Sequence, residues 1–248
     1  MIKAEIQLIR SLGEKKSRTE MGLFIAEGDK FIGELAVSEL SVRKVYLTED
    51  STLDGGEFDR STEVEWVSDK EMERLSQLKS ANNSLALVEM PRQTLNVEDL
   101  DGRLTIVLDG VQNPGNLGTI IRLADWFGVR DVICSPNCAD CFNPKVVQAT
   151  MGAILRVRIH YTDLLPLLKS TKQPIYGAFL EGDNIYKRDL TPNGILVMGS
   201  EGQGVSAEVS ALITERLYIP PYPADCVGSE SLNVAIATSI ICSEFRRR

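Results

Sequence analysis

The second half of the chain alternates short apolar runs with segments in which apolar residues recur every three or four positions. Runs rich in β-branched residues start at Leu104 (LTIVLDGV), Asp131 (DVICS) and Gly194 (GILVMGS). Helical periodicity separates them, for example in GTIIRLADWFG and PKVVQATMGAI. Continuous apolar strands that alternate with helices are typical of a mostly parallel sheet covered on both faces. Residues 104–248 are therefore expected to form an α/β domain with such a sheet.

The pattern of the first ninety residues predicts a smaller α/β unit. Apolar residues recur at helical spacing from Ile2 to Leu12, and LFIAEG has the composition of a strand that closes on a turn. Further elements are expected as a helix over 30–40, strands over 44–48, 63–68 and 84–90, and a helix after Ser68 or Asp69 as its N-cap. A polar segment with little periodicity begins at Pro91. We predict a domain over 1–92, a linker over 93–103 and a second domain over 104–248.

The composition agrees with this organisation. The chain has 248 residues, of which 43% are apolar, which is enough to build a core in each domain. No stretch approaches the roughly 18 apolar residues needed to cross a bilayer, and the amino terminus alternates charged residues with Ile and Leu. We expect a cytoplasmic protein without membrane association.

The charge balance restricts where a nucleic acid could bind. There are 27 Lys and Arg against 35 Asp and Glu, so the net charge of −8 does not attract phosphate overall. A local basic cluster lies within residues 3–18, where five basic residues face only two acidic ones. We predict RNA contacts for Lys15, Lys16 and Arg18 in this cluster. A solvated helix end explains the same pattern equally well.

The cysteines and the single histidine give little support to metal chemistry. Five cysteines, an odd number, without an export signal favour reduced thiols. Cys134, Cys138 and Cys141 lie close together in the sequence, but a zinc site needs a fourth ligand that the neighbouring residues do not supply. His160 lies in an apolar-alternating segment and is expected to be a strand residue. We expect no metal site, and the sequence assigns no role to the three clustered cysteines.

Three loops that follow predicted strands are candidates for chemistry, because ligands of parallel α/β sheets bind beyond the carboxyl ends of the strands. They are QNPGNLGTIIR after TIVLDGV, EGQGVS after ILVMGS, and PYPADCVGSESLN after RLYIP. Their glycines match neither the dinucleotide fingerprint G-x-G-x-x-G nor a Walker sequence. From the glycines alone, tight turns that need a positive φ are an equally good explanation.

Taken together and in order, the blocks N-P-G-N-L-G-x-x-x-R, G-S-E-G-x-G and I-P-P…E-S-L-N closely resemble the SpoU (TrmH-like) family of RNA ribose 2′-O-methyltransferases, part of the SPOUT superfamily. The resemblance covers residues 104–248. The first ninety residues, particularly KKSRTEMGLFIAEG, resemble the small ribosomal-protein-like substrate-binding domain often fused ahead of it. The family implies a parallel sheet with a deep trefoil knot, S-adenosylmethionine as cofactor, and a homodimer whose active sites the two subunits complete together.

The resemblance also implies roles for individual residues. The catalytic set is Asn116, Arg122, Glu201, Ser231 and Asn233. The cofactor set is Gly199, Glu201, Gly202, Gly204, Ile219 and Leu232, and Asn113 and Arg122 join the RNA contacts. A guanidinium with a pKa above about 12 is a poor proton acceptor. We therefore favour Arg122 as a phosphate-binding and charge-stabilising group over Arg122 as a base. An ion pair with Asp125 or a stack on Trp126 is the structural alternative for this side chain.

The expected function is methyl transfer from S-adenosylmethionine to the 2′-hydroxyl of a ribose in structured RNA, with ribosomal RNA as the expected substrate because of the N-terminal domain. Two alternatives stay open. One is a transfer-RNA ribose methyltransferase, and the other is a non-catalytic RNA-binding factor that retains the knot. The sequence does not identify the nucleotide that is modified.

Overall fold

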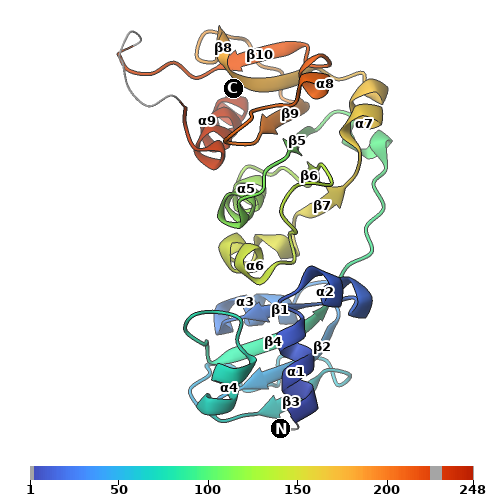
Figure 1. The fold of residues 1–248 in the computed structure, drawn as a ribbon, viewed down its shortest axis with the longest axis vertical. Helices are drawn as coiled ribbons and strands as arrows, with labels where there is room; N and C mark the ends of the chain where they lie inside the picture. Colours follow the sequence, from blue (N-terminus) through green and yellow to red (C-terminus); the bar gives the residue numbers. More distant parts are fainter. Residues whose placement is uncertain (1–2, 224–230, 248) are drawn as a thin grey trace. The chain divides into compact units, whose positions relative to one another are not determined.

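The computed structural model describes residues 3–223 and 231–247 (Figure 1). Residues 224–230, which include Cys226 and much of the third candidate loop, lie outside the described residues, as do Met1, Ile2 and Arg248. The chain divides into two compact units. The first comprises Met1–Arg92 with Asp140–Leu155, and the second comprises Gln93–Ala139 with Arg156–Arg248.

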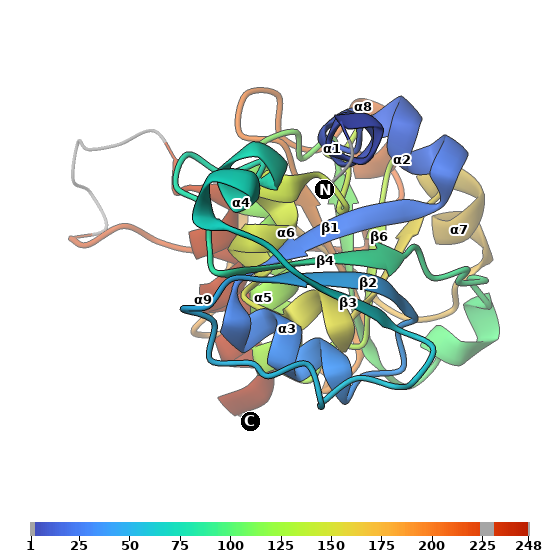
Figure 2. The ribbon, with the colours of Figure 1, turned by 90° about the horizontal axis from the view of Figure 1, so that it is seen from below.

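The first unit contains a four-stranded mixed sheet. Its strands are β1 (Leu23–Glu27), β2 (Val42–Leu47), β3 (Glu63–Trp66) and β4 (Ser84–Glu89). They lie in the order β1-β4-β2-β3, which Figure 2 shows face on. Strand β4 pairs antiparallel with β1 and β2, whereas β2 and β3 are parallel. The helices of this unit are α1 (Lys3–Ser11), α2 (Lys15–Met21), α3 (Asp29–Ala36), α4 (Asp69–Leu75), α6 (Pro144–Thr150) and the 3₁₀ turn η2 (Ala153–Leu155).

Both faces of β1 are covered, which explains why all five of its residues are buried. Leu23 and Ile25 belong to a core cluster with residues of α1 and α4. On the other face, α3 and α6 pack against β1, and the ring of Phe24 lies 4.8 Å from that of Phe142. Helix α4 starts at the expected cap, since Ser68 and Glu71 form a capping box.

The second unit contains a six-stranded sheet in the order β10-β8-β9-β5-β6-β7, and every neighbouring pair is parallel. The strands are β5 (Leu104–Asp109), β6 (Asp131–Cys134), β7 (Arg158–Tyr161), β8 (Ile175–Asn184), β9 (Gly194–Gly199) and β10 (Glu215–Tyr218). The helices are η1 (Val97–Leu100), α5 (Pro114–Trp126), α7 (Leu164–Ser170), α8 (Ala207–Ser210) and α9 (Val234–Arg247). The expected parallel α/β sheet is confirmed.

Helices cover both faces of this sheet (Figure 1). Apolar residues of η1, α7 and α8 form one core with β5, β6, β8 and β9. Helices α5 and α9 pack against each other on the opposite face, where Phe245 of α9 makes an edge-on contact with Tyr176 of β8. The near-continuous burial of the central strands β5 and β9 follows from this double cover.

Two segments differ from the sequence-based expectation. Residues 140–155 contain the predicted helix, observed as α6, but this segment clusters with the first unit rather than with the parallel sheet. Residues 93–103, expected to be a linker, contain η1, whose Leu100 is only 2% exposed within the core of the second unit. In both cases apolar side chains are covered by elements that are distant in the sequence.

The histidine and the four cysteines that the structure describes are buried. His160 is a buried residue of β7, as expected, and its Nε2 lies 3.0 Å from Oδ1 of Asp131. Cys134, Cys138, Cys141 and Cys242 are buried and form no disulfide bond. Within the described part of the chain, no helix is both long enough and apolar enough to span a membrane.

Candidate active site

Three polar side chains from three separate segments of the second unit meet in one hydrogen-bonded cluster. The carboxylate of Glu201 follows β9, and its Oε1 accepts hydrogen bonds from Nδ2 of Asn116 and from Nδ2 of Asn233, both at 2.6 Å. Nδ2 of Asn233 also lies 3.0 Å from Oδ1 of Asn116. Each of the three residues comes from a different candidate loop, so the structure brings together one polar side chain from each of the three sequence blocks.

Helix capping explains how Asn116 and Asn233 are positioned, since each lies at the start of a helix. Asn113 is the N-cap of α5 and accepts hydrogen bonds from the backbone N–H groups of Gly115 and Asn116, while Pro114 starts the helix. Asn233 precedes α9, and its Oδ1 accepts hydrogen bonds from N–H groups of Ala235 at 3.0 Å and Ile236 at 3.3 Å. Because its oxygen is used for the cap, the amide nitrogen of Asn233 is directed to Glu201.

Arg122 lies further along α5 and is exposed. Its two structural alternatives are not observed. The carboxylate of Asp125 is held instead by Arg156, with nitrogen–oxygen distances of 2.8–3.1 Å, and no cation–π contact joins Arg122 to Trp126, which is 83% exposed. Among residues 3–223 and 231–247, no hydrogen bond or ion pair involves the side chain of Arg122. The guanidinium is thus available to an anion from outside.

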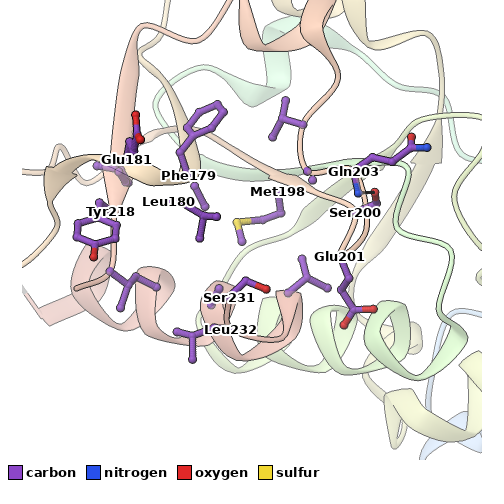
Figure 3. Close-up of a pocket in the computed structure, with 18 of the residues that line it drawn as sticks. Phe179, Leu180, Glu181, Met198, Ser200, Glu201, Gln203, Tyr218, Ser231 and Leu232 are labelled. Carbon is purple, nitrogen blue, oxygen red and sulfur yellow. Dashed lines mark hydrogen bonds between the residues drawn. The ribbon is translucent and has the colours of Figure 1, made fainter. Parts of the chain in front are cut away.

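A pocket of about 620 Å³ adjoins the polar cluster through Glu201, and Figure 3 shows its lining. It contains every residue of the predicted cofactor set, namely Gly199, Glu201, Gly202, Gly204, Ile219 and Leu232. Ser231 and Met198 also line it. The pocket combines apolar side chains with glycine-rich backbone, a combination that suits a small organic ligand with polar edges.

The glycine-bearing loop after β9 is folded on itself. Ser200 and Gly204 form a two-bond antiparallel bridge, with N–O distances of 3.0 and 2.8 Å. A side chain at Gly199 would lie 2.1 Å from the backbone carbon of Gly204, so this position accepts only glycine. Gly199 therefore serves the closure of the loop itself, whereas the space beside Gly202 is open. Oδ2 of Asp109 accepts a 2.8 Å hydrogen bond from the N–H of Ser206 and fixes the loop to the end of β5.

Sequence reasoning missed one wall of the pocket. Residues of β8 and β10 contribute to it, among them Phe179, Leu180, Glu181, Arg216 and Tyr218. For Phe179, Leu180 and Glu181 the sequence signal is their position at or just after the carboxyl end of the predicted strand PIYGAF, the same rule that identified the other loops.

The RNA contacts predicted in the first unit divide into two kinds. Lys15 and Lys16 are exposed. Arg18 is only 1% exposed, and its guanidinium donates hydrogen bonds to the carbonyls of Leu12 at 2.7 Å and Gly13 at 2.8 Å and forms an ion pair with Asp140 at 2.5 Å. The prediction that Arg18 binds RNA is wrong, because its donors are used inside the unit. Asn113 is exposed, with its Oδ1 engaged in the α5 cap.

No three His, Cys, Asp or Glu side chains of the described residues gather in a geometry that would hold a metal ion. The cluster of Asn116, Glu201 and Asn233 has one carboxylate and two amides, which bind one another. The polar groups of the site are therefore arranged as a hydrogen-bonding network.

Comparison with known proteins gives matches over both units. Residues 103–243 match the SpoU rRNA Methylase family, and residues 3–86 match the MRM3-like substrate binding domain. A 23S rRNA (guanosine(2553)-2′-O)-methyltransferase of Bacillus subtilis is 29% identical over 241 residues, which cover 96% of this chain and 94% of that protein.

Two solved structures are similar over nearly the full length. One, assigned to the TrmH family of RNA methyltransferases, comes from Porphyromonas gingivalis and has a TM-score of 0.87 and 38% identity, with coverage of 100% of this chain and 98% of that one. The other is an rRNA methyltransferase of Sinorhizobium meliloti with bound AdoMet, with a TM-score of 0.83, 26% identity and coverage of 99% and 95%.

Proposed function

Because the chain belongs to the SpoU rRNA Methylase family, we propose that it is an enzyme that transfers a methyl group from S-adenosylmethionine to a ribose 2′-hydroxyl of ribosomal RNA. The observation that carries the proposal is the hydrogen-bonded cluster of Asn116, Glu201 and Asn233 at the edge of a pocket. The similar B. subtilis protein, which methylates a guanosine ribose of 23S rRNA, supports the substrate class.

The pocket fits S-adenosylmethionine in size and in character. Its volume of about 620 Å³ lies within the range of cofactor sites. Apolar side chains such as Met198 and Leu232 suit the faces of an adenine ring, and the backbone of the loop after β9 offers donors and acceptors to its polar edges. When bound, S-adenosylmethionine supplies an electrophilic methyl group on a sulfonium.

The protein's own residues then position the RNA and stabilise charge. Glu201 and the two asparagines hold the start of α5, the turn after β9 and the start of α9 together, which lowers the entropy lost when a substrate is aligned. Arg122 presents five N–H donors to a phosphate or to the 2′-oxygen, which gains negative charge as its proton passes to solvent water. Since a guanidinium is protonated at neutral pH, Arg122 acts as an electrostatic stabiliser rather than as the base.

The proposal includes a homodimer and a trefoil knot in the second unit. Trp126 of α5 is 83% exposed and Ile236 of α9 is 52% exposed, on two helices that pack against each other. Val234, Ile241 and Phe245 on α9 are buried in the protomer, so this helix has a core-facing side and a further apolar side chain at its surface. These exposed side chains support an interface at α5 and α9, which sedimentation or light scattering at micromolar protein would test.

The decisive experiment is to map ribose methylation in total RNA from a strain that lacks this protein and to restore it with the purified protein and S-adenosylmethionine. We expect one ribosomal position to lose its methyl group and to regain it. A lost methyl group in transfer RNA would favour a transfer-RNA enzyme instead. If RNA binds but no ribose changes, the protein is a non-catalytic RNA-binding factor.

A further inference from the structure

The chain makes a tight turn directly after β6, at Ser135–Cys138. The N–H of Cys138 donates a 3.0 Å hydrogen bond to the carbonyl of Ser135, and Pro136 takes the second position of the turn, which suits its fixed φ. Ser135 and Cys138 are buried, whereas Pro136 and Asn137 are exposed. The turn thus presents one polar side chain, that of Asn137, at its tip.

Hydrogen bonds fix the turn to the end of β5 and to the loop that follows this strand. The thiol of Cys138 donates a 3.3 Å hydrogen bond to the carbonyl of Leu108 in β5. The N–H of Ala139 donates a 2.9 Å hydrogen bond to the carbonyl of Val111. The turn is therefore ordered against the first part of the loop that leads to Asn116.

The amide of Asn137 has a fixed orientation. Oγ of Ser135 accepts a 2.9 Å hydrogen bond from the N–H of Gly110 and donates its own proton to Oδ1 of Asn137 at 2.5 Å. Nδ2 of Asn137 has no hydrogen-bond partner among the described residues. A Cβ at Gly110 would lie 3.2 Å from this nitrogen and 3.8 Å from Cβ of Ser200. An unpaired donor is thus held close to the first residue after β5 and the first residue after β9.

The carboxyl edge of the sheet is divided between two regions. Strands β9, β5 and β6 are neighbours in that order. The pocket takes residues from β8, β9, β10 and the segment before α9, and none of the described residues in the loops after β5 and β6 lines it. The hydrogen bond between Asn116 and Glu201 joins the two regions. The free part of the edge, over β5 and β6, is where an RNA strand can lie while its ribose reaches the polar cluster.

We propose that Nδ2 of Asn137 donates a hydrogen bond to an acceptor oxygen of the RNA, on a phosphate or a base, and so positions the strand beside the methylated ribose. This inference rests on the proposed function. Because the turn and the amide are already ordered, the contact costs little conformational entropy. A neutral donor also needs no neighbouring positive charge, which suits a chain with a net charge of −8.

The test uses Asn137→Asp, which keeps the oxygen that accepts from Ser135 but replaces the donor by a second acceptor. With ribosomal RNA from a strain that lacks the protein, the KM for RNA should rise about tenfold, because a favourable contact becomes a repulsive one. The kcat should stay within about twofold, since the contact contributes equally to the ground state and the transition state. The melting temperature and the affinity for S-adenosylhomocysteine should not change, because the turn keeps its hydrogen bond and Asn137 does not line the pocket.

Two further variants separate the lost donor from the added charge. Asn137→Ala removes the donor without adding charge and should raise the KM about threefold. Asn96→Asp is the matched control, because Asn96 is an exposed asparagine of the same unit whose oxygen also accepts a backbone hydrogen bond, but it precedes β5. It should leave the KM within about twofold.

Three results would overturn the proposal. An unchanged KM in both variants of Asn137 would exclude the contact, and an equal rise in Asn96→Asp would assign the effect to net charge. A fall in kcat at unchanged KM would mean that Asn137 acts through Ser135 and Gly110 on the loop after β5.

Filter binding to polyuridylate and to the ribosomal RNA identifies the acceptor. Equal weakening of both by Asn137→Asp indicates a phosphate oxygen, and a loss confined to the ribosomal RNA indicates a base oxygen. Either result supports the contact. If the wild-type protein binds the ribosomal RNA but methylates no ribose, the proposed function fails, whereas the RNA affinities of the same variants still decide the role of Asn137.

Discussion

Two arginines of this chain lie in opposite environments, one in each unit. Arg18 in the first unit is buried, and its guanidinium is surrounded by two carbonyls and the carboxylate of Asp140. Arg122 in the second unit is exposed, and the neighbouring carboxylate of Asp125 is bound to Arg156 instead. Both were expected to bind RNA. Arg18 therefore stabilises the fold, because its hydrogen-bond acceptors belong to the protein. The guanidinium of Arg122 has no such acceptors among the described residues and is available to a ligand.

The physical reason is the cost of removing a charge from water. A buried guanidinium is tolerated only when nearly all of its donors are matched, so its partners must belong to the fold. An exposed guanidinium keeps its hydration and can exchange water for a phosphate at small cost. Stability and activity should therefore respond in opposite ways to replacing these two residues.

The largest effect is expected for Arg18→Ala. The substitution removes one partner of a buried ion pair and takes away the donors that Arg18 supplies to Oδ2 of Asp140 and to two carbonyls. We expect the free energy of unfolding, measured in urea, to fall by about 3–5 kcal/mol. Arg10→Ala, at an exposed position of α1, is the control and should change it by less than about 0.5 kcal/mol. Equal stability of the two variants would contradict the structural role of Arg18.

The second effect is expected for Arg122→Ala and concerns turnover. The rate of methyl transfer should fall about 10²–10³-fold, the size found when one donor to a developing oxyanion is removed. The free energy of unfolding and the affinity for S-adenosylhomocysteine should stay at wild-type values, because Arg122 is exposed and does not line the pocket.

Arg130→Ala, an exposed arginine in the turn before β6, is the matched control for turnover. Arg122→Lys keeps the charge but not the planar set of donors, so partial activity in that variant would show how much the charge alone supplies. A variant Arg122→Ala that unfolds as easily as Arg18→Ala would remove the contrast between the two arginines.

A smaller effect is expected at Asn233, where one side chain has two tasks. Its oxygen caps α9 and its nitrogen binds Glu201. Asn233→Ala should lose both, with about 1 kcal/mol of stability from the cap. Asn233→Asp keeps the cap but replaces the donor to Glu201 by a second carboxylate, so it should retain stability while turnover falls about tenfold. Equal turnover in Asn233→Asp and the wild type would show that the contact with Glu201 has no catalytic value.

The sequence allowed much of the second unit to be predicted. Apolar runs gave the strands, and their positions before the three loops led to Asn116, Glu201 and Asn233, which the structure joins by hydrogen bonds. The periodicity of α6 predicts an apolar face with Val146 and Val147, but not the sheet that covers it. Which sheet covers α6 depends on residues that are distant in the sequence, such as those of β1.

The wrong prediction for Arg18 and the missed wall of the pocket have the same cause. A cluster of basic residues does not reveal that Asp140 lies beside Arg18, because the two are 122 positions apart in the sequence. The wall formed by Leu180 depends on the register between β8 and β10, which shifts between Arg216 and Leu217. Local patterns predict elements, whereas partners and registers are set by the packing of the whole unit.

The smallest effect is expected for the pair Lys15→Ala and Lys16→Ala, which tests what remains of the basic cluster once Arg18 is assigned to the fold. Lys16 is 85% exposed at its side chain and lies 3.9 Å from Glu20, a distance at which an exposed ion pair contributes little. Both lysines lie at the start of α2, in the unit that matches a substrate binding domain.

If these two lysines contact phosphates, the double variant should bind its RNA a few-fold more weakly at moderate salt. The slope of log affinity against log salt should decrease by about one unit for each lysine, because each phosphate contact releases roughly one counterion. Stability should not change, since both residues are exposed. Lys169→Ala with Lys172→Ala, two exposed lysines of the second unit, is the matched control for a general loss of charge. An equal change of slope in both pairs would mean that only net charge matters. An unchanged slope in the first pair would mean that Lys15 and Lys16 belong to a solvated helix end and make no contact with the RNA.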